Sequence, residues 1–181
     1  MATYIAFLRA INVGGRFIKM VDLRTGLSDM GFADVESHIQ SGNLRFTSSL
    51  QSAAKVERAV ETALEELCGF TVRTIVRTPA QLGEITSYGA GLAAPLDGEV
   101  RRYVTFLKEA PSDGFVVLVN GWDVVGERAH VHGREVFVWL AHPAHEAKLT
   151  NARIERGGVV ATTRDWKVVS ALGERWGPTL P

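Results

Sequence analysis

The chain lacks the features that mark secreted, membrane-bound or nucleic-acid-binding proteins. Among its 181 residues there is one cysteine, Cys68, which excludes an intrachain disulfide. Lys plus Arg number 20 and Asp plus Glu number 20, so there is no basic excess of the kind expected for a nucleic-acid binder. The opening apolar run is broken by Arg9 and Asn12, and no basic region precedes it, which fits neither a signal peptide nor a membrane span. We therefore expect a cytoplasmic location and no membrane partner.

Familiar catalytic and cofactor motifs are missing as well. No set of acid, base and nucleophile is marked, and neither a phosphate-binding loop nor a dinucleotide fingerprint is present. Two histidine pairs, His130 with His132 and His142 with His145, would suit zinc, but no cysteine or carboxylate pattern accompanies them. We predict no cofactor and no metal, and the sequence indicates no particular reaction.

What is present is typical of a soluble globular protein, with 46% hydrophobic and 22% charged residues. Apolar periodicity in the first half predicts the order strand, helix, strand, strand, helix, strand. In residue numbers, the expected elements are 4–11, 20–30, 35–40, 44–47, 55–67 and 71–77. In the second of these helices the apolar stripe leaves Glu57 and Glu61 for water. Thr78, Pro79 and Gln81 then combine into a start signal for a further helix.

The second half repeats this order. We expect a strand over residues 102–108 and a hairpin that turns at Gly133 and Arg134. A helix over 146–156 and a last strand over 159–161 follow. Thr163 is expected to cap a final helix that begins at Arg164. Aligning 76–79 with 161–164 matches the two strand-to-helix junctions and suggests a duplicated topology.

One segment of the second half gives conflicting signals. The β-branched content of residues 115–122 favours a strand. The repeated order of elements favours a helix, because tertiary context often overrides local propensity. We predict the helix.

The expected fold is therefore α+β, with two ferredoxin-like halves, each βαββαβ plus a helix, packed in one compact unit. The first half is assigned to residues 1–88 and the second to 101–181. Residues 89–100, within a stretch rich in Gly, Ala and Pro, form the predicted linker.

Two features of the first half carry unusual polar chemistry. Gly14 and Gly15 precede a helix, where backbone N–H groups and the helix start favour an anion, although a plain tight turn explains the glycines equally. Arg9 is expected in mid-strand, where a guanidinium requires a partner. If Arg45 and Arg77 share its sheet face, that face requires counter-charges, a covering domain or an anionic ligand.

Two sequence motifs resemble those of a known family. FLRAINVGG (7–15) and IQSGN (39–43) are similar to motifs of the domain-of-unknown-function family DUF1697, and TTRDW (162–166) resembles its closing motif, with Asp165 at a usual asparagine. The resemblance implies an α+β protein of two ferredoxin-like halves and supplies no activity. The positions that match the polar motifs of the family are Arg9, Asn12, Lys19, Gln40, Ser41, Asn43, Lys148, Thr163 and Arg164. Ala147 replaces a serine that the family has beside the retained Lys148.

We hypothesise that these residues, with Gly14 and Gly15, line a cleft at or between the halves and bind a small phosphorylated or carboxylated anion. Arg9, Lys19 and Arg164 would supply the charge. One alternative is a nucleic-acid-binding module that uses the arginine-bearing sheet face. The other is a structural or interaction protein, in which the motif residues satisfy one another.

Overall fold

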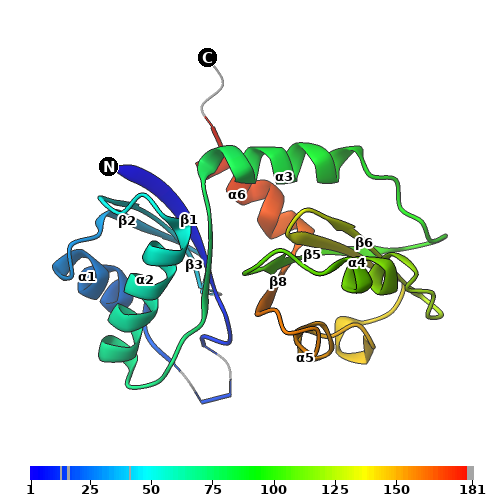
Figure 1. The fold of residues 1–181 in the computed structure, drawn as a ribbon, viewed down its shortest axis with the longest axis horizontal. Coiled ribbons are helices and arrows are strands. Elements are labelled where there is room, and N and C mark those ends of the chain that lie inside the picture. Colours follow the sequence, from blue (N-terminus) through cyan, green and yellow to red (C-terminus); the bar gives the residue numbers. More distant parts are fainter. Residues whose placement is uncertain (13, 16, 41, 179–181) are drawn as a thin grey trace. The chain divides into compact units, whose positions relative to one another are not determined.

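The computed structural model describes residues 1–12, 14–15, 17–40 and 42–178. These residues form a mixed α+β fold with two four-stranded antiparallel sheets and six α-helices (Figure 1). Within this part of the chain, no helix has the length and apolar character needed to cross a membrane.

By its internal contacts the chain divides into two compact units, Met1–Gly83 with the chain from Leu172 onward, and Glu84–Ala171. The division falls inside helices α3 (Pro79–Gly91) and α6 (Trp166–Trp176). Helix α3 therefore covers the start of the predicted linker 89–100. The predicted boundaries 1–88 and 101–181 stay a prediction.

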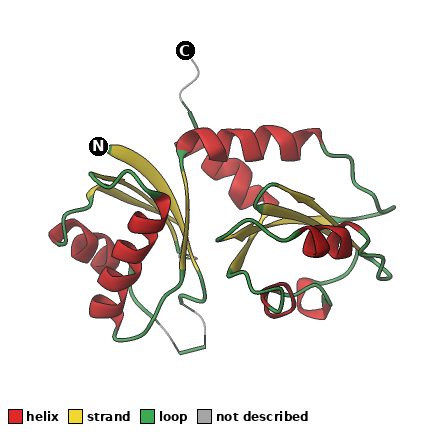
Figure 2. Ribbon diagram, in the orientation of Figure 1, coloured by secondary structure: helices red, strands yellow, loops and turns green. Residues whose placement is uncertain are grey.

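The first unit is built on the sheet β2-β3-β1-β4. Figure 2 shows its helices in red and its strands in yellow. In chain order its elements are β1 (Ala2–Leu8), α1 (Met20–Asp29), β2 (Ala33–His38), β3 (Asn43–Ser48), α2 (Ala53–Cys68) and β4 (Thr74–Arg77). Strand β1 pairs antiparallel with both β3 and β4 and is therefore central, as its apolar run predicted.

The core of this unit lies between the sheet and helices α1 and α2 (Figure 1). Tyr4, Ala6 and Leu8 of β1 belong to it, and Ile5 and Phe7, on the opposite face of the strand, are also fully buried. The strand ends at Leu8, so the expectation of Arg9 in mid-strand was wrong. Arg9 follows the strand, its N–H donates to the Arg73 carbonyl at 2.8 Å, and Ala10 and Asn12 then take positive φ.

The expectation that Glu57 is left for water was also wrong. Its side chain is 4% exposed, and it accepts the Val76 N–H at 3.0 Å. The half-buried Glu61 accepts the Thr74 N–H at 2.9 Å. Strand β4 has a neighbour on one side only, and these carboxylates occupy donors that an edge strand otherwise leaves unpaired. Helix periodicity alone gives no sign of such a sheet edge.

The second unit is built on the sheet β6-β7-β5-β8, the same order as in the first unit. Its elements are β5 (Arg101–Leu107), α4 (Asp113–Asn120), β6 (Glu127–His132), β7 (Glu135–Leu140), the 3-10 helix η1 (Ala144–Glu146), α5 (Asn151–Glu155) and β8 (Ala161–Asp165). Helix α5 and η1 replace the single helix expected over 146–156.

The conflicting segment of the second half is helical, which confirms the prediction. Helix α4 places Phe115 and Val119 in the core against Leu107 and Val131. The Ser112 side chain caps it by accepting the Phe115 N–H at 3.3 Å. Burial of one face and a good cap outweigh the β-branched propensity of the valines.

The end of the second unit differs from the prediction by several residues. Thr163 lies within β8, and α6 begins at Trp166. Asp165, rather than Thr163, accepts a backbone N–H at the helix start, that of Lys167 at 2.8 Å.

The predicted alignment of 76–79 with 161–164 differs by two residues from the match that the sheets show, because Arg77 corresponds to Arg164 rather than to Thr162. Arg77 lies opposite Ile5 in the sheet, and Arg164 lies opposite Val104. Each guanidinium donates to the carbonyl of the preceding residue, at 2.8 Å for Arg77 and 2.9 Å for Arg164. The two buried arginines are therefore structurally equivalent.

Candidate functional site

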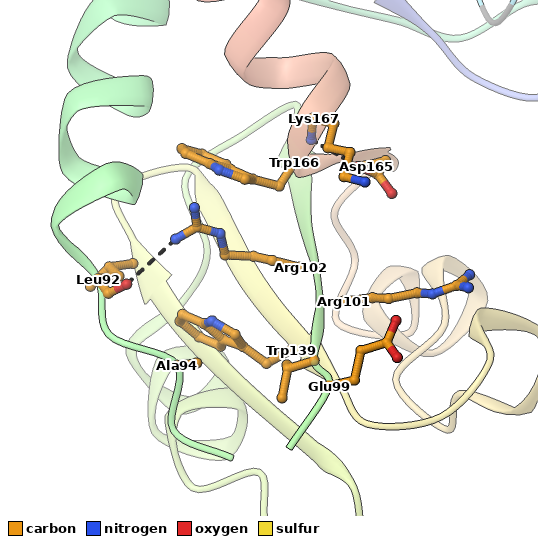
Figure 3. A pocket seen from close by; sticks show the side chains of 10 residues that line it. Leu92, Ala94, Glu99, Arg101, Arg102, Trp139, Asp165, Trp166 and Lys167 are labelled. Atoms are coloured by element: carbon orange, nitrogen blue, oxygen red, sulfur yellow. Dashed lines mark hydrogen bonds between the residues drawn. The ribbon is translucent and has the colours of Figure 1, made fainter. Parts of the chain in front are cut away.

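The second unit contains a pocket of about 650 Å³ at the end of its sheet (Figure 3). The walls come from the chain after α3, the start of β5, strand β7, and the junction of β8 with α6. The lining residues are Leu92, Ala94, Glu99, Val100, Arg101, Arg102, Trp139, Asp165, Trp166 and Lys167. Concave sites of this size are usual for small ligands.

Arg102 is the central side chain of the pocket. Figure 3 shows it between the indoles of Trp166 and Trp139, and its guanidinium carbon lies 3.8 Å from the centroid of the Trp166 ring. Nη1 donates to the Gly89 carbonyl at 2.5 Å and approaches the Leu92 carbonyl at 3.5 Å. Partial burial lowers the pKa of Arg102 from its ordinary value, because the charged form loses hydration. Among the described residues, no carboxylate forms an ion pair with it.

The alternation of β5 and β7 explains why these side chains meet. Arg102 lies directly opposite Trp139 in the antiparallel register, and side chains directly opposite one another share a face. That face is turned away from the core that α4 and α5 share with Val136, Val138 and Leu140.

Helix α3 contributes by approaching the same sheet face closely. A Cβ at Gly89 would lie 2.5 Å from the Trp166 ring and 2.7 Å from Phe137. A glycine is therefore required for the helix to pack here and to present its carbonyl to Arg102. Gly89 thus holds α3 against the indole of Trp166, which lines the pocket.

Cations outnumber anions around the pocket, with Arg101, Arg102 and Lys167 against Glu99 and Asp165. Asp165 is engaged in capping α6. Figure 3 shows Glu99 beside Arg101. The balance gives the pocket a cationic character, which favours an anion.

Comparison with known proteins places the chain in a family. The model of the family described as "Protein of unknown function (DUF1697)" matches residues 1–137. The chain belongs to the DUF1697 family. No curated protein matches it. A solved structure of a conserved bacterial protein from Streptococcus pneumoniae is similar with a TM-score of 0.70 and 24% identity, covering 97% of this chain and 98% of the other. At that identity the likeness shows the fold alone.

The DUF1697-like motifs of the first unit form a hydrogen-bonded loop pair. Asn12 Nδ2 donates to the Gln40 carbonyl at 3.0 Å, and Asn12 Oδ1 accepts the Ile18 N–H at 2.9 Å. Asn43 is fully buried, and its Nδ2 donates to the His38 carbonyl at 3.3 Å. Asn12 therefore connects the loop after β1 with the turn before β3.

A glycine in the second motif serves the same junction. Gly42 has φ +72°, and a Cβ there would lie 2.5 Å from Ile11 Cγ2 and 2.9 Å from Leu8 Cβ. Its carbonyl accepts the Leu8 N–H at 2.8 Å. Packing against the end of β1 thus explains this glycine without a ligand.

Apart from the half-buried Arg9, the other predicted residues of the first unit are solvent-facing or lie outside the described part. Gly14 and Gly15 are exposed and have positive φ. Lys19 is exposed at the N-cap of α1 and makes no side-chain cap bond. The side chain of Gln40 is also exposed. Ser41 lies outside the described residues.

The predicted residues of the second unit have separate roles. Thr163 is bonded through its hydroxyl to Asn151 Oδ1 at 2.6 Å and to Thr105 Oγ1 at 2.7 Å. Arg164 is 8% exposed, and burial lowers its pKa to about 10. Nη1 of Arg164 donates to the Thr162 hydroxyl at 2.8 Å. Lys148 is exposed, and its backbone N–H donates to Glu127.

Glu127 is a buried acceptor that the motif analysis missed. Its carboxylate accepts the N–H groups of Lys148 and Leu149 and the Trp122 Nε1–H, and His142 Nε2 lies 3.3 Å away. Burial alone raises the pKa of Glu127, but these donors outweigh burial and the pKa lies below its ordinary value. The segment 142–149 is thus held by a carboxylate distant in sequence.

The first histidine pair, His130 and His132, contacts the side chain of Tyr88. Tyr88 Oη lies 2.7 Å from His130 Nε2, and the Tyr88 ring stacks on His132 with centroids 3.7 Å apart. Burial, and then the neighbouring His132, lower the pKa of His130. In the described part of the chain, no group of three or more His, Cys, Asp or Glu residues is placed to hold a metal.

The eleven predicted site residues are thus divided between the units, eight in the first and Lys148, Thr163 and Arg164 in the second. Their convergence on one ligand stays a prediction. The pocket residues Arg101, Arg102 and Trp139 were not among them. The sequence does show two adjacent arginines at the start of a predicted strand. It does not show the strand register that places Arg102 opposite Trp139.

Proposed function

We propose that this protein binds a small anionic ligand, phosphorylated or carboxylated, in the pocket around Arg102. The observation that carries the proposal is the guanidinium itself. It is partly desolvated, lies against an indole and, within the described residues, has only backbone carbonyls as hydrogen-bond partners. A desolvated cation without a counter-ion is costly, and an anion entering the pocket would offset that cost.

The neighbouring side chains support the same class of ligand. Arg101 and Lys167 add two cations at the pocket wall, and an arginine can hold a carboxylate or phosphate through two parallel hydrogen bonds. Trp139 and Trp166 supply apolar walls that limit water near the charge, so each ion pair is screened less than on an open surface. Binding, rather than a reaction, is the function that these groups support.

The fold supports a related proposal about architecture. Each unit has the order βαββαβ, and the sheets have the matching orders β2-β3-β1-β4 and β6-β7-β5-β8. These features support two ferredoxin-like halves, each followed by a helix. A cytoplasmic location is also proposed, supported by the single cysteine.

The nucleic-acid alternative gains no support from the sheet face on which it depended. Arg45 forms an ion pair with Glu36 at 3.1 Å, and Arg77 is 2% exposed. Glu36 also accepts hydrogen bonds from Arg175 and Trp176. The hydrogen bonds among the first-unit motifs agree with the alternative of a structural or interaction protein. The pocket of the second unit favours a protein that binds a ligand.

A thermal-shift screen against phosphate, pyrophosphate, citrate and other phosphorylated or carboxylated metabolites tests the proposal. A ligand that binds only the folded protein raises its melting temperature. We expect at least one anion to do so, with the shift lost in Arg102→Gln and in the double variant Arg101→Gln/Lys167→Gln. Failure of the whole panel, or a shift unchanged in both variants, contradicts the proposal.

A further inference from the structure

A second hollow of about 350 Å³ lies between α4 and α5 of the second unit. Its floor is apolar, formed by Phe115, Val119, Trp122 and Ile154, each less than 9% exposed. The Trp122 Nε1–H is engaged by Glu127 at 3.0 Å, so the indole presents only its ring to the hollow. The floor therefore offers no polar group to a guest.

The rim of this hollow combines exposed apolar surface with positive charge. Leu118 lines it and is 65% exposed. Arg153 and Arg156 also line it, and none of the described lining residues is acidic. Among the described residues neither arginine forms an ion pair, and Arg153 lies over the Trp122 ring at 4.7 Å.

We infer that this hollow binds an amphipathic carboxylate, with the hydrocarbon chain on the apolar floor and the carboxylate between Arg153 and Arg156. A water molecule occupies about 30 Å³ of the liquid, so the volume accommodates about a dozen heavy atoms. A straight carboxylate of about ten carbons has that size. Burying its chain removes apolar surface from water, which favours binding, and the arginines supply hydrogen bonds to the charged head.

The arrangement favours a small molecule over an apolar segment of another protein. Two arginines and an apolar floor line the same hollow, which matches a ligand with one charged end and one apolar end. An apolar protein segment would cover Leu118 but would leave both guanidinium groups without an acidic partner. The inference concerns a hollow separate from the Arg102 pocket and does not depend on the function proposed above.

Calorimetric titration with sodium decanoate below its micelle concentration tests the inference, with decanol as the uncharged ligand of the same length. Decanoate should bind saturably with one-to-one stoichiometry. Decanol lacks the charged head and should therefore bind about tenfold more weakly. A tenfold change in affinity corresponds to about 1.4 kcal/mol. The double variant Arg153→Gln/Arg156→Gln should weaken decanoate binding by a similar factor and leave decanol binding unchanged.

Controls keep the outcome interpretable. Arg153 and Arg156 are exposed, so the double variant should keep the far-ultraviolet circular dichroism and melting temperature of the parent. Arg101→Gln, in the other pocket, should bind decanoate like the parent protein. No saturable binding, equal affinity for decanol, or decanoate binding that survives the double substitution would overturn the inference and leave the exposed rim to a protein partner.

Discussion

The two units share an order of elements but differ in what their polar side chains contact. In the first unit, the motif asparagines Asn12 and Asn43 bond to backbone groups of neighbouring segments, as Asn12 does with Gln40 and Ile18. In the second, Arg102 lies in an open pocket between two tryptophans and has no carboxylate partner among the described residues. The comparison teaches that a conspicuous polar motif can stabilise a junction, while the side chain available to a ligand lies in an ordinary-looking strand.

The strongest test of internal hydrogen bonding concerns Glu127. Glu127→Leu leaves the Trp122 indole and the N–H groups of Lys148 and Leu149 without their acceptor. We expect a loss of about 3–5 kcal/mol in the free energy of unfolding, the usual cost of breaking a buried charged network. Urea unfolding measures it. The exposed Glu146→Gln is the matched control and should change stability by less than about 0.5 kcal/mol; equal effects would show that the network contributes nothing special.

The same carboxylate predicts a pH dependence. Its pKa in the folded protein lies below the ordinary value, so the unfolded state binds the proton more tightly. The stabilisation is complete above the ordinary glutamate pKa and is lost as the pH falls through the folded value. The difference in unfolding free energy between Glu127→Leu and the parent should be constant near neutral pH and shrink in acid. A difference that grows in acid would contradict the sign.

A pair of glycines tests the junction in the first unit. Gly42→Ala places a Cβ 2.5 Å from Ile11 Cγ2 at a positive φ, whereas Gly14→Ala has a positive φ and no atom within 4 Å. We expect a loss of about 2–4 kcal/mol for Gly42→Ala, from overpacking added to backbone strain. Gly14→Ala should cost about 1 kcal/mol from strain alone. Chemical denaturation of both variants measures the difference, and equal losses would exclude a packing role for Gly42.

A smaller effect is expected at the start of α3, the helix that runs from one unit into the other. Thr78 Oγ1 accepts the Gln81 N–H at 3.2 Å, and Gln81 Oε1 accepts the Thr78 N–H at 2.9 Å. Thr78→Ala should therefore cost about 1 kcal/mol. Ser52, at the N-cap of α2, makes no side-chain cap bond, so Ser52→Ala should be nearly neutral. Thermal unfolding distinguishes them, and equal losses would contradict the capping account.

Much of the architecture could be predicted because its signals are local. The apolar run of β1, the stripe of α2 and the cap at Thr78 each reflect neighbouring residues, and all appear near their expected positions. The β8 boundary was misjudged because Thr163 suits both a helix cap and a strand. Pairing with Thr105 of β5 decides for the strand.

The candidate site was predicted less well, because it depends on register and on contacts distant in sequence. Nothing near Arg102 in the sequence indicates that Trp139 lies opposite it or that Gly89 allows α3 to approach. Glu57 looked solvent-facing for the same reason, since its partner Val76 belongs to a strand nineteen positions away. Long-range pairing, rather than composition, places these groups.

The central claim is that the second-unit pocket holds an anion through Arg102. Calorimetric titration with pyrophosphate at low ionic strength tests it most directly, because screening is then weakest. We compare Arg102→Gln with Arg9→Gln, the first-unit arginine that the sequence favoured. The account predicts saturable binding that Arg102→Gln weakens at least tenfold, or by about 1.4 kcal/mol, and that Arg9→Gln leaves unchanged. Binding that survives Arg102→Gln and is lost in Arg9→Gln would contradict it.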